Sequence, residues 1–371
     1  MVFGAGYDTN QDTDGAPLAG TIGDNIYMVN ALTGSKIWDA KTDAAQYNEA
    51  GNISSMSSVP ADVKVIDPTM PGFIQHIYAS DMLGQIFRFD FDTDWTGAVG
   101  SEGSLAQGGL LAELQTAANG TTCTAESCNR RFYYSPDVAI VPRPDGKTFI
   151  SIAIGSGYRA HPLDVDTSDH FYGLRDMGIL KPEVRTVSAS LVETPFKQFD
   201  NNDGTAGSSS GSEVIRLANL VDVTNRADPT ASPSPLSAIE SDNTPKAGWF
   251  FSLDDGEKVL SESLTFNNRV IFTTYLPPDS SVNTCGPGLG TGRAFAVSIT
   301  DGTAVVDFNN DGYTKDDRSI DLHNIGIPPD PQIIVLGSGP ELLIGRQLAT
   351  ELIDVDWGEM DRIKWRERNS R

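Results

Sequence analysis

The sequence lacks any run of about 18 apolar residues, the length that a helix needs to cross a bilayer. It is also poor in positive charge, because 27 Lys and Arg residues stand against 50 Asp and Glu, which gives a net charge of −23. Nucleic-acid phosphates and anionic membrane surfaces would repel such a chain. We therefore expect no nucleic-acid partner and no membrane span, whereas metal cations are compatible with the carboxylate excess.

Cysteine is scarce as well, with three residues in the whole chain. Cys123 and Cys128, in "TTCTAESCNR", are close enough in sequence to bridge across a short loop, and Cys285 is left over. A Cys-x4-Cys pair without a second pair is weak evidence for zinc. A disulfide would indicate an oxidising compartment, and two free or buried thiols are the alternative.

The first residues, "MVFGAGYDTN", lack the basic stretch and the apolar stretch of a signal peptide. They read as the middle of a β-strand. We therefore expect residues 1–371 to be a fragment of a longer protein, whose export signal is not present in this chain.

Patterns typical of helices are few, and short alternating apolar segments separated by glycine-rich turns fill most of the chain. Three segments read as β-hairpins, at residues 25–38, 76–89 and 293–306. A strand that ends in Gly-x-Gly recurs at residues 2–9, 152–160 and 334–341. No helix and no third glycine follow, so the pattern is not that of a dinucleotide-binding loop.

Helical periodicity is confined to residues 104–117 and 211–223, which flank low-complexity stretches at 203–212 and 228–237. Many short strands, repeated hairpins and glycine-rich turns predict an all-β fold. We expect a modified β-propeller of about seven blades, complete or incomplete, with helical or low-complexity insertions near 96–130 and 201–245.

One acidic segment, "VVDFNNDGYTKDD" at residues 305–317, has the spacing of a calcium loop. Asp307, Asn309 and Asp311 occupy the first, third and fifth positions, and Gly312 stands where the chain must bend. Calcium prefers oxygen ligands, so these side chains and the Tyr313 carbonyl suit it.

The end of this segment departs from the pattern. Lys315 and Arg318 stand where a water-bridging ligand and a bidentate carboxylate are expected. The closing carboxylates, Asp316 and Asp317, arrive one or two residues early, and a shortened loop would still close on Asp317. The residues leave two interpretations open, a calcium site and a solvated acidic turn.

Two further acidic segments are weaker candidates. The segment "YDTNQDTDGA" (7–16) alternates Asp and Asn but lacks a glycine at the bend, which favours a solvated turn over a second calcium site. The segment "HPLDVDTSDH" (161–170) offers two His and three Asp, and plain surface residues are favoured over a transition-metal site. No Gly-x-Ser-x-Gly elbow is present, so nothing indicates a hydrolase of that type.

Six segments occur in an order that is similar to a known family. They are "VFGAGYDTNQDTD", "NIYMVNALTGSKIW", "HIYASDMLGQIFRFDF", "IGSGYRAHPLDVDTSDHFYGLRD", "GWFFSLDDGEKVLSESLTFNNRVIFTTYLPP" and the terminal "WRE" (365–367). This order resembles the C-terminal half of the PilC/PilY family of type IV pilus biogenesis and adhesion factors, over nearly the whole chain.

The resemblance implies a modified β-propeller, secretion, and a place at the pilus tip or outer membrane with pilins or minor pilins as partners. It also implies calcium-controlled support of pilus assembly, restraint of retraction, and contact with a host or abiotic surface. Some relatives carry an Asp-x-Asn-x-Asp-Gly loop after the hairpin that matches residues 293–306, where Asp307, Asn309 and Asp311 stand here.

The function expected on these grounds is that of a non-enzymatic, calcium-binding module of a pilus-tip protein. Two alternatives from other classes are a quinoprotein-like propeller enzyme and a purely structural adhesin module without metal. Quinone-dependent alcohol dehydrogenases resemble one another in an adjacent Cys-Cys pair beside the cofactor, and this chain has none.

Overall fold

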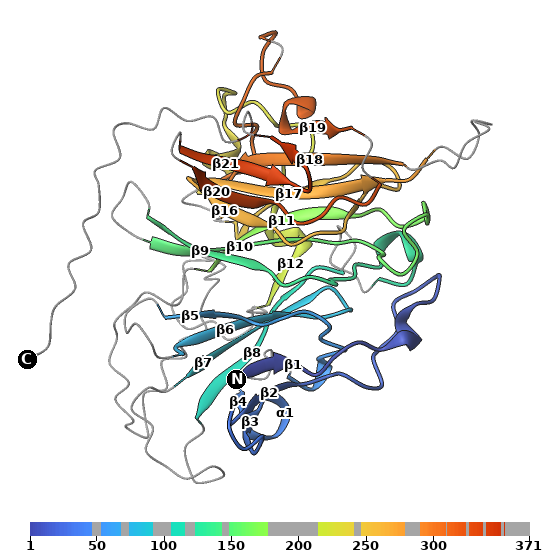
Figure 1. The fold of residues 1–371 in the computed structure, drawn as a ribbon, viewed down its shortest axis with the longest axis vertical. Coiled ribbons are helices and arrows are strands. Elements are labelled where there is room, and N and C mark those ends of the chain that lie inside the picture. The colour runs from blue at the N-terminus through green and yellow to red at the C-terminus, as the bar shows by residue number, and fades with distance from the viewer. Residues whose placement is uncertain are drawn as a thin grey trace, which may run out of the picture.

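The computed structural model describes residues 1–46, 53–67, 74–91, 105–115, 123–142, 148–176, 214–240, 246–278, 290–308, 310–323, 326–336, 339–349 and 352. These residues form five β-sheets that succeed one another along the chain, from the first (blue) to the fifth (red) in Figure 1. The α-helices of the described part are two short ones, α1 (Ala40–Asp43) and α2 (Pro235–Ile239), and none of its helices has the length and apolar character to cross a membrane. The predicted all-β class is confirmed.

Apart from one short strand, the first two sheets contain residues from the N-terminal third of the chain. The first sheet has the order β1 (Val2–Gly4), β2 (Ile26–Val29), β3 (Lys36–Asp39). The second has the order β5 (Lys64–Ile66), β6 (His76–Ser80), β7 (Gln85–Phe91), β8 (Ala106–Glu113), and two short strands pair with β8 in parallel, β4 (Ala45–Gln46) and β12 (Ile215–Arg216).

The other three sheets follow the same meander. The third has the order β9 (Asp137–Pro142), β10 (Thr148–Gly155), β11 (His170–Asp176), β14 (Gly248–Ser252), with β13 (Val221–Asp222) parallel to β14. The fourth consists of β15 (Lys258–Val259), β16 (Leu264–Phe266), β17 (Arg269–Leu276), β18 (Thr291–Ser298) and β19 (Ser319–Leu322). The fifth has the order β20 (Gln332–Leu336), β21 (Gly339–Ile344), β22 (Gln347–Leu348).

Five short 3-10 helices lie in the described connections: η1 (Thr9–Gln11), η2 (Ile53–Ser55), η3 (Glu126–Cys128), η4 (Leu217–Asn219) and η5 (Lys315–Arg318).

Each inner sheet is buried on both faces, which explains why its strands read as nearly continuous apolar runs. Successive side chains of a strand point to opposite faces. In β11, Tyr172 packs toward the second sheet, while Phe171 packs toward the fourth. In β17, Phe272 packs toward the third sheet and Ile271 toward the fifth. Four hydrophobic clusters thus bind the five sheets face to face in sequence order.

The ring expected of a propeller is not closed by the described residues. None of the four clusters joins the first sheet to the fifth, and none of the five sheets closes on itself. The three predicted hairpins do lie in three different sheets, although the second arm of 293–306 pairs only through the bridge between Val297 and Ala304. The number of about seven blades stays a prediction.

The prediction of a helix at 104–117 is wrong, because residues 106–113 form β8, which pairs with β7 in antiparallel orientation. The helical spacing of its leucines is outweighed by Gly108, whose missing side chain lets two backbones approach. A Cβ atom there would lie 2.2 Å from the Arg88 carbonyl oxygen. The described part of 211–223 likewise forms β12, η4 and β13 rather than an α-helix.

Cys123 and Cys128 form a disulfide with their Cα atoms 5.7 Å apart, as their spacing suggested. The bridge closes the loop that contains η3 beside the third sheet. Cys285 and residues 201–213 of the predicted second insertion lie outside the described residues.

Candidate metal centre

The acidic segment 305–317 connects β18 to β19 in the fourth sheet and ends in η5, next to β19 in Figure 1. Three of its predicted ligands, Asp307, Asp311 and Asp317, each place one carboxylate oxygen within 4.8 Å of the others. Oxygens on opposite sides of a calcium ion, each about 2.3–2.6 Å from it, lie about 4.6–5.2 Å apart. The three oxygens therefore fit the coordination sphere of one hard cation of this size.

Asp317 is held in place by the start of η5. Its carboxylate accepts hydrogen bonds from Thr314 N (2.7 Å), Thr314 Oγ1 (2.9 Å) and Phe308 N (3.1 Å). The side chain is only 3% exposed. Burial alone would raise its pKa, but these hydrogen bonds hold the pKa of Asp317 below its usual value, so the carboxylate is charged at neutral pH.

Asp307 organises the first half of the loop in the same way. Its two carboxylate oxygens accept from Asn310 N at 2.8 Å and Gly312 N at 3.1 Å. The chain turns back through Gly312, whose φ of +105° lies in the left-handed region that glycine adopts without a Cβ penalty. The predicted bend at this glycine is confirmed.

The remaining predicted ligands differ in their outcome. Asp316 is exposed and does not belong to the group of three carboxylates, so Asp317 closes the cluster where the sequence left a choice between the two. Tyr313 is half-buried, and the position of its carbonyl as a ligand stays a prediction. Asn309 lies outside the described residues.

The two cations of the loop are directed away from the carboxylates. Arg318 donates to the carbonyls of Gly302, Thr224 and Val223 and lies over the Phe251 ring, 4.7 Å from its centroid. Burial lowers the pKa of this guanidinium to about 10, and it stays charged at neutral pH. Arg318 therefore anchors the loop to the third sheet.

Lys315 faces a different carboxylate from those of the loop. Its Nζ lies 3.6 Å from Asp254 Oδ1, and the other oxygen of Asp254 accepts from Arg293 Nη1 at 2.6 Å. Because the ammonium pairs outside the cluster, its charge opposes metal binding less than the sequence pattern suggested.

The residue that sequence reasoning missed is Thr314. It precedes η5, and its backbone and hydroxyl groups both bind Asp317, so it fixes which carboxylate points into the loop. The signal was present, because Thr-x-x-Asp at 314–317 has the spacing of a capping box, which relates a Ser or Thr to an acidic or amide residue three positions later.

The segment 7–16 is only in part the solvated turn that its sequence favoured, because Asp8 is buried while Asp14 is exposed. Asp8 is fully buried and accepts from Asn10 N, Thr21 N, Thr21 Oγ1 and Ile22 N, which hold its pKa below the usual value. Asp12 accepts from the hydroxyls of Tyr7 and Tyr133. The buried Asp8 carboxylate is a hydrogen-bond acceptor for backbone amides, a role that residue spacing alone does not reveal.

The segment 161–170 is divided between surface and interior. Asp169 and His170 are buried at the start of β11, 1% and 7% exposed, whereas His161 and Asp166 are exposed. Among the residues that the structure describes, no three metal-ligating side chains gather here. The interpretation of all these residues as plain surface groups is therefore wrong for Asp169 and His170.

Comparison with known proteins shows the fold. No family model matches the chain, and no curated protein matches it. Among solved structures, the chain is similar to the crystal structure of the Pseudomonas aeruginosa PilY1 C-terminal domain, with a TM-score of 0.55 and 16% identity over 94% of this chain and 68% of that one. The resemblance stated from the sequence is thus confirmed at the level of fold.

Proposed function

We propose that this chain is a calcium-binding, non-enzymatic propeller module of a protein that acts in type IV pilus assembly, extension and retraction, and surface adhesion. The observation that carries the proposal is the group of three carboxylates from Asp307, Asp311 and Asp317, set on a fold like that of the PilY1 C-terminal domain. The ordered segments that resemble the PilC/PilY family support the same assignment. The proposed partners are pilins or minor pilins, together with a host or abiotic surface ligand, at the cell surface or pilus tip.

The residues fit a hard cation by the chemistry of their donors. All three side chains offer carboxylate oxygens, the ligands that calcium prefers. Gathering three like charges within 4.8 Å is unfavourable without a counter-ion. A bound calcium ion would offset two of these three charges, while Asp307 and Asp317 keep the loop in shape through their hydrogen bonds to backbone amides.

The same geometry links the loop to the body of the molecule. Asp317 and Arg318 are neighbours, and Arg318 reaches carbonyls that flank β13 of the third sheet and the turn after β18 of the fourth. We infer that ordering of the loop by metal reinforces the contact between these two sheets, and that this is how the ion affects the module.

Calcium titration of wild type and two variants tests the proposal. We expect wild type to bind one ion with a Kd of about 10⁻⁵–10⁻³ M, the range of sensor and extracellular sites. Asp311→Ala removes one carboxylate of the group and should weaken binding by on the order of tenfold or more, since affinity follows the ligand charge. Isothermal titration calorimetry measures the calcium affinity of both proteins.

Asp316→Ala is the matched control, because it removes the same charge from the same loop at an exposed carboxylate outside the group. Its isotherm should equal that of wild type within about twofold. Equal weakening by Asp311→Ala and Asp316→Ala would show a general charge effect and contradict the proposed site.

A further inference from the structure

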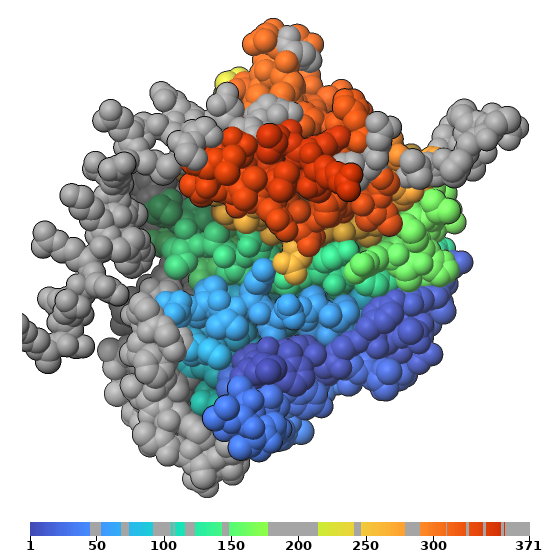
Figure 2. All heavy atoms as spheres, viewed as in Figure 1, coloured from blue at the N-terminus to red at the C-terminus, as the bar shows by residue number. Residues whose placement is uncertain are grey.

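Two copies of one sequence element meet at one end of the molecule. Each contains Gly-x-Gly-Tyr followed by an acidic segment, at residues 4–16 and 155–169, and they belong to the first and third sheets. Arg131 Nη2 donates to Thr13 O at 2.8 Å and Asn129 Nδ2 to Gly15 O at 3.1 Å, which fixes the first copy against the third sheet's connections. In Figure 2 the blue and green surfaces adjoin at the right-hand edge.

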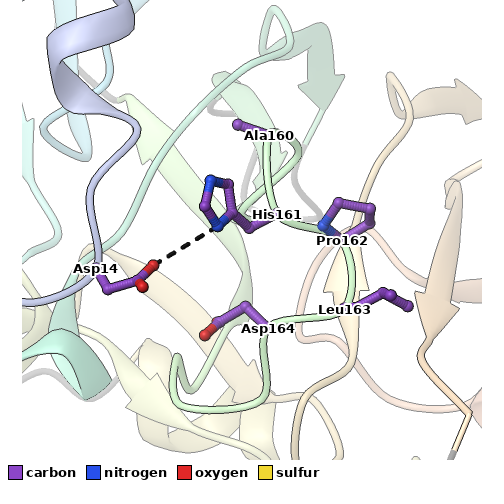
Figure 3. A pocket seen from close by; sticks show the side chains of 6 residues that line it. All are labelled: Asp14, Ala160, His161, Pro162, Leu163 and Asp164. Atoms are coloured by element: carbon purple, nitrogen blue, oxygen red, sulfur yellow. Dashed lines mark ion pairs between the residues drawn. The ribbon is translucent and has the colours of Figure 1, made fainter.

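An open pocket of about 410 Å³ lies where the two copies meet, as Figure 3 shows. It is lined by Asp14, Ala160, His161, Pro162, Leu163 and Asp164. The carboxylates of Asp14 and Asp164 and the imidazole of His161 surround the space, and His161 Nδ1 lies 3.6 Å from Asp14 Oδ1. The pocket is thus acidic on two sides.

The rest of its wall is apolar and solvent-accessible. Leu163 is 64% exposed and Pro162 stands beside it. An exposed leucine next to two carboxylates suits a ligand that carries a cation on an aliphatic stem. A small inorganic anion or a purely apolar ligand would leave one of the two kinds of wall without a partner.

A stack of side chains connects the pocket residue His161 to the interior of the protein. The His161 ring lies parallel to the Tyr158 ring, with centroids 4.7 Å apart, and the guanidinium carbon of Arg131 lies 3.7 Å from the Tyr158 centroid. Tyr158 is fully buried, and its hydroxyl has no hydrogen-bond partner among the described residues. Burial and the carboxylates of Asp14, Asp12 and Asp164 together raise the pKa of Tyr158 to about 12, against the opposing charge of Arg131. The hydroxyl is therefore a neutral, buried group with unused hydrogen-bonding capacity.

A bare metal ion does not fit this arrangement. Within the described part of the chain, the three residues that bring metal-ligating atoms within 4.8 Å of one another are those of the 305–317 loop, not those of the pocket. Asp14, His161 and Asp164 therefore do not close around one ion as a group of three, and a wider cation that donates hydrogen bonds in more than one direction suits them better. A guanidinium group is such a cation, and its plane stacks on aromatic rings.

We propose that this pocket binds an arginine side chain presented by a partner protein, with the guanidinium between Asp14 and Asp164 and against the His161 ring, and with the aliphatic stem on Leu163. The complementarity of charge follows from the two carboxylates, and the specificity for a planar cation follows from the ring. The proposal does not depend on calcium at the 305–317 loop, and each one stands if the other fails.

Nuclear magnetic resonance titration of the full chain with Nα-acetyl-arginine methylamide tests this proposal. We expect amide shifts centred on residues 160–164. The neutral isostere Nα-acetyl-citrulline methylamide should bind at least about tenfold more weakly, since it lacks the charge. Asp14→Asn, an exposed residue, should weaken binding about three- to fivefold, whereas Asp62→Asn, an exposed carboxylate that does not line the pocket, should leave it unchanged.

Several results would overturn the assignment. If the citrulline compound bound as tightly as the arginine compound, charge would have no role in binding. If Asp14→Asn bound the arginine compound as tightly as wild type, the binding site would not be this pocket. Tighter binding of the matching lysine compound would contradict the preference for a planar cation. Shifts of the same amides by calcium or zinc chloride at lower concentration would make the pocket a metal site instead.

Discussion

Asp317→Ala is expected to weaken the protein even in the absence of calcium. The substitution leaves Thr314 N and Phe308 N without their acceptor at a side chain that is 3% exposed. Loss of a helix-capping carboxylate and of buried hydrogen bonds costs about 1–3 kcal/mol in the free energy of unfolding. Urea denaturation in EDTA measures this loss, and addition of calcium should restore little of it, because the same carboxylate is a ligand.

The matched variant is Asp311→Ala, because Asp311 belongs to the same group of carboxylates but is exposed. We expect it to change the metal-free stability by less than about 0.5 kcal/mol and to lose most of the gain that calcium gives to wild type. If Asp317→Ala and Asp311→Ala behaved alike in EDTA, the capping role of Asp317 would be wrong.

The contribution of Asp317 should also depend on pH in a defined direction. Its pKa in the folded protein is lowered, so its hydrogen bonds stabilise the fold fully above the unfolded value of about 3.9. The contribution is lost as the pH falls through the folded pKa. The difference in stability between wild type and Asp317→Ala should therefore shrink below about pH 4, which denaturation at a series of pH values would show.

Arg88→Ala is expected to have a larger effect on stability than any surface change. Arg88 is 1% exposed and lies between the second and third sheets, where it donates to both oxygens of Asp176 at 3.0 Å and to Asp90 at 2.7 and 2.8 Å. Removing the cation leaves two buried carboxylates without their main partner, which costs about 3–5 kcal/mol. The midpoint of urea denaturation should fall accordingly.

Arg159→Ala is the control for this change, because Arg159 is an exposed arginine whose guanidinium lies 5.4 Å from the Tyr134 ring centroid. It should cost less than about 1 kcal/mol. The triple variant Arg88→Met, Asp90→Asn, Asp176→Asn should regain part of the loss, since it removes the uncompensated charges. A loss below 1 kcal/mol for Arg88→Ala would mean that the network between the two sheets is not structural.

The all-β class was predictable because short runs of β-branched and aromatic residues between turns are visible in single strands, such as residues 269–276, where Val270 and Phe272 face one neighbouring sheet and Ile271 the other. The error at 104–117 also comes from a local pattern. Leucines at 105, 110, 111 and 114 also satisfy a helical period, and only the contact of Gly108 with Arg88 and Phe89, distant in sequence, decides the structure.

The first half of the candidate metal centre could be predicted from the sequence, but the carboxylate that closes it could not. Oxygen-bearing side chains at the alternate positions 307, 309 and 311 predict oxygen ligands by their spacing, whereas the choice between Asp316 and Asp317 depends on how η5 begins at Thr314. The pocket proposed to bind arginine could not be predicted from the sequence. Its acidic walls lie about 150 residues apart in the chain, and only the packing of the first sheet's loop against the third brings Asp14 to His161.

The central claim is that one calcium ion binds between Asp307, Asp311 and Asp317. The most direct measurement is a crystal structure of the protein grown with calcium chloride, with anomalous diffraction recorded at a long wavelength. The account predicts one strong anomalous peak about 2.3–2.6 Å from an oxygen of each of these three carboxylates. Electron density for the ordered loop without such a peak, or a peak at Asp14 and Asp164 instead, would contradict it.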